Sequence, residues 1–444
     1  MKKRMALTLL ALLTIVMAAC SSSGGADSPG TDSGESGSGK TAQKPVTLTL
    51  LSHYVGQNEV AFKPYIDQWN SENPDIQIKL TPVDFGELLR TIMTKQTAGQ
   101  APDLMHIYTL WGGQLAKNNV LAFAPDDVAA DIEANYPASA VAASSIDGRV
   151  YGYPTEVQAY GLFYNKKLLQ EAGYGGPPKT WDELIEMAQH IERDDGSGMP
   201  SVQGFGFLRG YAGKVVQPFM ALMATAGGTL LTDDMSAAAL DTEAAKRTID
   251  LYAKVYGKDG ITDIGFPTQQ AFGSGKAAMT IEAGWWAGSL KTLMKDGYAD
   301  IGAAPLPSPD GLTQGSLAYT WAWSVNAKSK HQEEAWKFLK WFNTQKVKND
   351  MTPQGNFLLE GFNVISTRAS DMESETIKRK LEEDPVTKVF ADALQYARPE
   401  QNPAAAAEIQ DALFKQIENM WADKATKEEA LAAAQKEIQA KLGK

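Results

Sequence analysis

The chain has 444 residues, with 42 lysines and arginines against 53 aspartates and glutamates, which gives a formal net charge of −11. This acidic balance, with no basic stripe in the sequence, argues against nucleic-acid binding. A single cysteine excludes an internal disulfide. The chain is also too long for one hydrophobic core, so two lobes are expected.

The N-terminus has a basic head at residues 2–4 and an apolar run from Met5 to Met17. This run is shorter than the roughly 20 residues that a membrane-spanning helix needs, so it predicts an export signal. The small residues before Cys20 resemble a lipoprotein signal-peptidase site, although Met17 stands where that pattern prefers leucine. We therefore expect a signal peptide over residues 1–20 that ends at a lipidated Cys20. An ordinary signal peptide with an incidental cysteine is the alternative.

Residues 21–44 are rich in serine and glycine, with scattered acidic residues. Such a composition cannot bury a core and predicts a flexible tether. A lipidated cysteine followed by a tether indicates a folded domain held just outside the cytoplasmic membrane, an arrangement that fits a Gram-positive cell best.

Strand and helix patterns alternate after the tether. Apolar residues alternate with other residues from Val46 to Leu50 and from Ile76 to Leu80, which predicts two strands. A helical pattern between them stops at Asn73, and another runs from about Phe85 to Ala98 before a third strand near Leu104. This alternation predicts α/β layers.

The ends of these three strands supply the first candidate site residues, since ligands of open α/β sheets lie beyond the carboxyl ends of strands. The candidates are His53, Tyr54, Asp84, Tyr108 and Trp111. Two of them have structural alternatives. Asp84 has the residue type and place of a helix N-cap, and Trp111 could pack inside the lobe.

The segment from Tyr160 to Leu184 has the clearest local signals. Tyr160 to Asn165 predicts a buried strand, and a short helix then stops at Gly173. Thr180 with Glu183 three residues later predicts a capping box at the start of a helix, and Thr426 with Glu429 predicts another near the C-terminus. The order of elements is therefore strand, helix, loop, helix.

The same segment carries a family resemblance. A strand ending in Tyr-Asn-Lys at 164–166, followed by Pro-Pro-Lys-Thr-Trp-Asp-Glu-Leu at 177–184, resembles the extracellular solute-binding proteins of bacterial ABC importers, in particular the carbohydrate branch similar to maltodextrin-binding proteins. Asn-Pro-Asp-Ile at 73–76, Gly-Lys-Ala-Ala-Met at 275–279 and Pro-Leu-Pro at 305–307 also resemble that family. The resemblance implies an α/β fold of the two-lobed periplasmic-binding-protein type (type II), with a mixed sheet and flanking helices in each lobe and a ligand cleft between them.

On this basis we expect residues 45–155 and 324–375 to form the N-terminal lobe, and residues 156–323 and 376–444 to form the C-terminal lobe. The chain should cross between the lobes near Thr155. It should return in a strand whose alternation places Tyr319, Trp321 and Trp323 on one face.

The second lobe supplies the remaining candidates. The resemblance implies that Glu156 and Gln158 grip ligand hydroxyls, with solvated edge positions as the alternative. It also places Trp285 where relatives stack an aromatic ring on the sugar, although two adjacent tryptophans are compatible with core packing as well. The strand-end positions in this lobe, together with these residues, give the candidates Glu156, Gln158, Arg209, Glu282, Trp285, Trp286, Tyr319 and Trp321.

Several enzyme signatures are missing from the sequence. It contains no His-Glu-x-x-His, no Cys-x-x-Cys, no complete Walker A motif and no Gly-x-Ser-x-Gly. None of the four histidines has metal-ligand spacing. We expect no catalysis, no cofactor and no metal. Paired carboxylates for glycoside hydrolysis remain open, because acidic residues are plentiful.

The export signal and the resemblance together imply a monomeric, lipid-anchored extracytoplasmic protein that captures a carbohydrate, of oligosaccharide size, by lobe closure. It would deliver the sugar to the permease of an ABC transporter whose ATPase is a separate subunit. A lipid-anchored glycoside hydrolase and a binding protein for a non-sugar solute are the alternatives.

Overall fold

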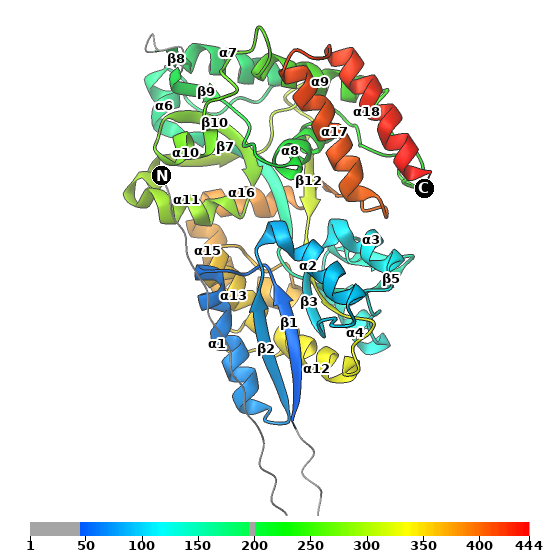
Figure 1. Cartoon of the computed structure of the whole chain (residues 1–444). Helices are drawn as coiled ribbons and strands as arrows, with labels where there is room; N and C mark the ends of the chain where they lie inside the picture. Colours follow the sequence, from blue (N-terminus) through cyan, green and yellow to red (C-terminus); the bar gives the residue numbers. More distant parts are fainter. Residues whose placement is uncertain (1–44, 195–199, 444) are drawn as a thin grey trace, which may run out of the picture. The chain divides into compact units, whose positions relative to one another are not determined.

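The computed structural model describes residues 45–194 and 200–443. The predicted signal peptide, the lipidated Cys20 and the tether of residues 21–44 lie outside these residues. Two sheets organise the described part of the chain, and a lobe is built on each (Figure 1). The prediction of a mixed α/β fold with two lobes is confirmed.

The first sheet has the strand order β2-β1-β3-β13-β6. Its strands are β1 (Val46–Ser52), β2 (Ile76–Pro82), β3 (Leu104–Tyr108), β6 (Gly152–Pro154) and β13 (Trp321–Val325). β1 runs parallel to β2 and β3, whereas β13 runs antiparallel to β3 and β6.

Alternation along β1 divides the core of this lobe between the two faces of the sheet. Leu48 and Leu50 pack with residues of α1 (Gln57–Glu72), α4 (Asp126–Asn135), α12 (Gln332–Thr344) and α13 (Pro353–Phe362). Leu51 instead packs with residues of α2 (Phe85–Thr97) and α3 (Gly112–Lys117). The first sheet is therefore covered on both faces.

The second sheet has the order β14-β12-β7-β10-β9-β8, with β11 also paired to β7. Its strands are β7 (Gln158–Asn165), β8 (Arg193–Asp194), β9 (Pro200–Phe205), β10 (Ala277–Ala283), β11 (Ile301–Ala304), β12 (Ser316–Tyr319) and β14 (Ala397–Pro399). One face packs on α6 (Lys166–Glu171), α7 (Trp181–Ile191), α8 (Ala212–Thr225), α9 (Glu243–Val255), α17 (Ala406–Trp421) and α18 (Lys427–Leu442). The other packs on α10 (Thr268–Gly273), α11 (Trp286–Met294) and α16 (Pro385–Ala393).

The remaining elements are short. They are η1 (Thr109–Trp111), α5 (Ala138–Ala143), β4 (Ser145–Ile146), β5 (Arg149–Val150), η2 (Lys295–Asp300), α14 (Ala369–Met372) and α15 (Glu375–Glu383). Both predicted capping boxes are confirmed. Thr180 and Glu183 exchange their hydrogen bonds at the start of α7, and Thr426 and Glu429 do so at the start of α18.

Two of the passages of the chain between the sheets are short, whereas the third, from β13 to β14, runs through α12 to α16. β6 ends at Pro154 and β7 begins at Gln158, close to the predicted crossing. The return differs from the single strand expected from Tyr319 to Trp323. The second sheet's β12 ends at Tyr319 and the first sheet's β13 begins at Trp321, because the Thr320 carbonyl leaves both ladders to accept hydrogen bonds from Thr109. One residue therefore separates the two sheets at this crossing.

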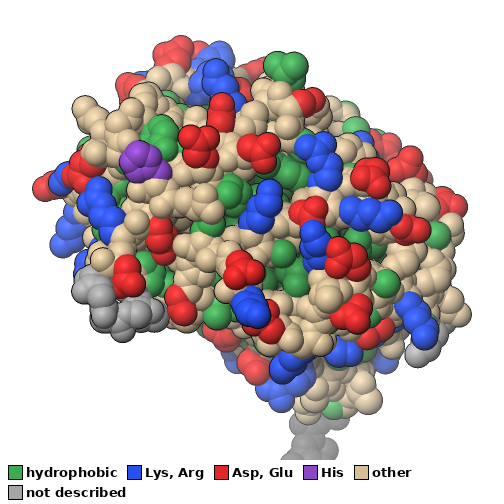
Figure 2. Space-filling view, turned by 90° about the horizontal axis from the view of Figure 1, so that it is seen from above, with side chains coloured by type: hydrophobic (Ala, Val, Ile, Leu, Met, Phe, Trp, Pro, Cys, Tyr) green, Lys and Arg blue, Asp and Glu red, His purple; other side chains and the backbone are tan. Residues whose placement is uncertain are grey.

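The outer surface of the second lobe is polar. Figure 2 shows the face at the top of Figure 1, where acidic and basic side chains are interspersed and hydrophobic side chains form only small separate areas. On this face, the described residues offer no broad apolar area for another protein to cover.

Candidate functional site

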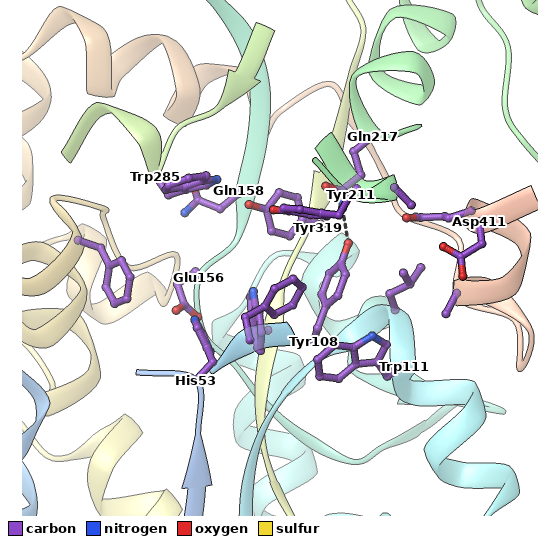
Figure 3. Close-up of a pocket in the computed structure, with 18 residues that line it drawn as sticks. His53, Tyr108, Trp111, Glu156, Gln158, Tyr211, Gln217, Trp285, Tyr319 and Asp411 are labelled. Atoms are coloured by element: carbon purple, nitrogen blue, oxygen red, sulfur yellow. Dashed lines mark hydrogen bonds between the residues drawn. The ribbon is translucent and has the colours of Figure 1, made fainter. Parts of the chain in front are cut away.

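A cavity of about 430 Å³ lies between the two sheets. This volume lies within the usual range for small-molecule sites. Figure 3 shows side chains from both lobes facing one another across it. Its lining residues are His53, Phe85, Tyr108, Leu110, Trp111, Glu156, Gln158, Tyr211, Ala212, Gly213, Gln217, Trp285, Tyr319, Trp321, Phe362, Ala407, Gln410 and Asp411.

The first lobe contributes through the carboxyl ends of its strands. His53 directly follows β1, Tyr108 is the last residue of β3, and Trp111 ends the 3₁₀ turn that follows β3. These residues line the cavity because parallel strands direct their carboxyl ends to the same sheet edge. Trp321 joins them from the start of β13, beside Tyr108 in the antiparallel register.

The second lobe contributes from helix starts and strand ends. Trp285 immediately precedes α11, and Tyr211 immediately precedes α8. Gln158 opens β7, and Tyr319 closes β12. In Figure 3, Trp285, Gln158 and Tyr211 lie on the side of the cavity opposite His53 and Tyr108.

Aromatic rings form most of the cavity wall in the first lobe. Trp321 stacks on His53 with ring centroids 3.8 Å apart and on Tyr108 at 5.5 Å. Trp111 meets Trp321 edge-on at 5.8 Å and stacks with Phe85 at 5.9 Å. In the second lobe, Trp285 stacks with no other aromatic ring among the described residues. Its indole face is therefore available to a ligand.

Eight of the thirteen predicted site residues line this cavity: His53, Tyr108, Trp111, Glu156, Gln158, Trp285, Tyr319 and Trp321. The other five, Tyr54, Asp84, Arg209, Glu282 and Trp286, are placed elsewhere. Their positions have ordinary structural explanations.

Three of these five are buried. Tyr54 is fully buried and donates its hydroxyl to Glu156 at 2.8 Å, behind the wall. Trp286 packs in the core against Phe163 and Phe272. Glu282 is buried at the end of β10, where its carboxylate accepts a hydrogen bond from the backbone N–H of Ala283.

The other two lie on the surface. Asp84 is the N-cap of α2, with its side chain accepting from the Gly86 N–H, as the alternative interpretation predicted. Arg209 is exposed and lies over the ring of Tyr256.

The structure also brings residues to the site that the sequence did not indicate. Gln217 lies within α8, and Gln410 and Asp411 lie within α17, so their positions depend on how these helices pack. Gln217 and Gln410 are buried polar residues on mostly apolar helix faces. A polar residue at a core position of an amphipathic helix is the signal that could have identified them.

Gln217 and Gln410 belong to a buried hydrogen-bond network around Glu400. The Tyr108 hydroxyl donates to Glu400, and the amides of Gln217 and Gln410 donate to it at 3.0 Å and 2.7 Å. Burial raises the pKa of Glu400. Tyr108 belongs to the first lobe and the two glutamines to helices of the second, so the network joins the lobes.

The charged side chains that line the cavity are all acidic. Its lining includes two carboxylates, Glu156 and Asp411, and no lysine or arginine among the described residues. Asp411 has no ion-pair partner among the described residues. Burial, followed by the charge of Glu408, raises the pKa of Asp411. An anionic ligand would therefore meet negative charge without a compensating cation.

One cluster has the residue types of a metal site. His53, His106 and Glu156 bring one ligand atom each within 4.8 Å of one another. His106 lies between its two neighbours, however, and presents Nδ1 to His53 at 3.1 Å but Nε2 to Glu156 at 3.4 Å. Both nitrogens of His106 are thus engaged with neighbours in this structure, and a metal ion would have to replace one of these contacts.

The fold and the aromatic cavity between two lobes are those expected of a protein that binds a small solute. A family model described as bacterial extracellular solute-binding protein matches residues 56–349. The chain belongs to this family, and the resemblance noted in the sequence is confirmed. No helix among the described residues has the length and apolar character required to cross a bilayer.

Curated relatives and solved structures agree with this assignment. The chain is 26% identical to the maltotriose-binding protein of Pyrococcus abyssi, over 83% of this chain and 74% of that protein. It is 26% identical to the maltodextrin-binding protein MdxE of Bacillus subtilis, over 77% and 76%. The solved GacH receptor of Streptomyces glaucescens has the same fold, with a TM-score of 0.76 at 24% identity, and the match covers 90% of this chain and 99% of that one.

Proposed function

We propose that this protein captures a neutral oligosaccharide in the cavity between its lobes and delivers it to the permease of an ABC transporter. The main observation that supports this proposal is the lining of the cavity, where four tyrosine, tryptophan or histidine rings of the first lobe face Trp285, Tyr211 and Tyr319 of the second, with no lysine or arginine among the described lining residues. Relatives named for maltotriose, maltodextrin and arabinooligosaccharide support the same ligand class.

The proposed binding combines stacking with hydrogen bonding. Sugar rings have an apolar C–H face that a flat indole covers well, and the unstacked face of Trp285 is suited to this contact. Gln158, Gln217 and Gln410 carry amides that can both donate and accept at hydroxyls. A hydroxyl-free solute would leave the buried amide of Gln158 without this partner, which disfavours it, whereas the amides of Gln217 and Gln410 already donate to Glu400.

Capture by closure follows from the position of the cavity. A ligand that contacts both lobes favours the arrangement in which they are together, and only its higher affinity for that arrangement shifts the population. The permease would then recognise the closed form. The protein itself would leave the sugar chemically unchanged.

The export and anchoring predictions are part of the proposal. We propose that Cys20 is lipidated and that residues 21–44 hold the folded unit, as a monomer, outside the cytoplasmic membrane. We also keep the division into residues 45–155 with 324–375 and residues 156–323 with 376–444. Membership of β1 and β7 in different sheets supports this division, while β13 indicates a return crossing near Thr320.

A thermal-shift screen over neutral oligosaccharides, uronic-acid oligosaccharides, amino acids and polyamines tests the ligand class. A neutral oligosaccharide should raise the melting temperature, since a ligand at one hundred times its Kd adds about 2.7 kcal/mol of stability. The uronic-acid counterpart should not. A shift by a non-sugar solute alone would contradict the proposal, and chromatographic detection of shortened sugar after incubation would indicate a hydrolase.

A further inference from the structure

The carboxylate of Glu156 is already occupied by the protein's own donors. Its Oε1 accepts the Tyr54 hydroxyl at 2.8 Å, and its Oε2 accepts the hydroxyl of Thr155. Oε2 also lies 3.4 Å from Nε2 of His106. Although Glu156 lines the cavity, its hydrogen-bonding capacity is therefore directed mainly into the protein interior.

These contacts determine where the ring protons of His106 lie. Thr155 donates its single hydroxyl proton to Glu156. Its oxygen can therefore only accept from His106 Nε2, which lies 3.0 Å away. The Tyr54 hydroxyl, 3.4 Å from the same nitrogen, also donates its proton to Glu156 and can therefore only accept from His106. Nε2 of His106 is consequently the protonated nitrogen. Burial lowers the pKa of His106, so the ring is neutral and Nδ1 carries a lone pair.

The proton position in His53 follows from that of His106. The two Nδ1 atoms are 3.1 Å apart, so one of them must donate. Since His106 Nδ1 has no proton, His53 donates from Nδ1. Burial, and then the neighbouring His106, lower the pKa of His53 to about 3, so this ring is also neutral and its Nε2 is a pure acceptor. No donor among the described residues reaches that Nε2.

The ring of His53 is held in place from a second direction. Trp321 stacks on it with a centroid distance of 3.8 Å and an interplanar angle of 25°. His53 lines the cavity, whereas His106 is fully buried. This relay of hydrogen bonds therefore runs from Glu156 and Thr155 through the buried His106 to His53, a ring that a ligand can touch (Figure 3).

We propose that Glu156, Thr155 and His106 are positioning residues that fix His53 in its Nδ1–H tautomer, so that His53 Nε2 accepts a hydrogen bond from a ligand hydroxyl. This inference rests on the proposed function for the identity of the donor group. It makes His53 a specificity residue for solutes that present an O–H, and it gives Glu156 a role that acts through His53.

Histidine ¹⁵N NMR of the ligand-free protein tests the tautomers directly. The chain has only four histidines, and His53→Gln identifies the His53 signals. His53 should be protonated at Nδ1 and unprotonated at Nε2, and His106 should show the opposite pattern. His53 protonated at Nε2 in the wild-type protein would overturn the proposal, and this measurement requires no variant to fold apart from the one used for assignment.

Two substitutions of Thr155 separate a relay from simple packing. Thr155→Val keeps the shape but removes the oxygen that accepts from His106, so His106 and His53 should populate both tautomers. Thr155→Ser keeps the oxygen and should retain the wild-type spectrum. Identical spectra for the two variants would contradict the relay.

A zinc titration tests the alternative that the cluster binds a metal ion. Coordinated shifts of both histidines on addition of one equivalent of ZnCl₂, reversed by EDTA, would replace the relay with a metal site.

Calorimetric titration with maltotriose then tests the binding role. Thr155→Val should weaken the affinity about tenfold, the usual effect of a lost hydrogen bond, whereas Thr155→Ser should bind as the wild type does. Equal affinities would overturn the specificity role. If the screened oligosaccharides fail to bind the wild type while the tautomers are as expected, the proposed function fails and the relay stands. If the tautomers differ from those expected while sugar binding is intact, the relay fails and the proposed function stands.

Discussion

Two adjacent tryptophans in this protein have opposite environments, and they provide a matched pair at the residue scale. Trp285→Ala should weaken sugar binding by about tenfold to a hundredfold, as expected for loss of an aromatic anchor, while leaving thermal stability near that of the wild type. Trp286→Ala should instead lower the free energy of unfolding by about 3–5 kcal/mol, because Trp286 is 3% exposed and fills the core. Calorimetric titration and urea unfolding distinguish the two effects. Unchanged affinity in the first variant would remove Trp285 from the site.

Glu282 gives a prediction about pH. Burial raises the pKa of this carboxyl to about 7, so the folded state holds a proton that the unfolded state releases above its ordinary pKa. The free energy of unfolding should therefore fall as the pH rises from about 4.5 to 7, by roughly 2–3 kcal/mol. Glu282→Gln, which resembles the neutral acid, should remove this part of the pH dependence in urea unfolding. An unaltered pH profile would contradict the shift.

The same scale shows what the sequence could not predict about the site. Strand-end reasoning found His53, Tyr108 and Trp111, because the topology alone places them at one edge. It could not exclude Tyr54 or Glu282, which follow or end a strand as the lining residues do but point their side chains into the interior. Which of two neighbouring side chains faces the cavity depends on packing between lobes.

At the scale of an element, substitutions at the start of α7 measure how much its capping box contributes to the free energy of unfolding. The Thr180 hydroxyl accepts from the Glu183 N–H at 3.0 Å, and Glu183 accepts from the Thr180 N–H at 3.1 Å. Thr180→Ala should reduce the free energy of unfolding by about 1 kcal/mol. Thr180→Ser should stay close to wild type because serine caps as well. Indistinguishable urea midpoints for the two variants would show that this box contributes nothing.

Elements with local determinants were the ones that the sequence predicted well. The capping boxes at Thr180 and Thr426 and the alternating strand at Val46 were found because each depends on residues within one turn or one strand. The break at Thr320 was missed, because the carbonyl of that residue is drawn out of the strand by Thr109, which is far away in the sequence. Gln217 and Gln410 were missed for the same reason, since only helix packing brings them to Glu400.

At the scale of the whole molecule, the hydrogen bonds around Glu400 are expected to stabilise the contact between the lobes. Tyr108→Phe removes the hydroxyl that the first lobe donates to Glu400. Without ligand, this variant should lose about 1.5–3 kcal/mol of unfolding free energy, the range for hydrogen bonds to charged groups. Small-angle X-ray scattering should also show a larger radius of gyration, because the lobes would separate more readily.

Tyr151→Phe is the control for this experiment. Tyr151 is also buried, but its hydroxyl donates to the Ala143 carbonyl at 2.8 Å within the first lobe. It should lower stability without changing the scattering. If both variants scattered alike, the contact between Tyr108 and Glu400 would not hold the lobes together.

The single-residue connection at Thr320 bears on any attempt to change the ligand specificity of this protein. Tyr319 and Trp321, which flank that residue, both lie on the cavity wall. One of the connections between the two lobes is therefore flanked on both sides by residues of the cavity wall. We expect substitutions of Tyr319 or Trp321 to alter the geometry of this connection as well as the cavity wall, whereas substitutions of Trp285 or Asp411, which lie at the start of α11 and within α17, would alter the wall alone.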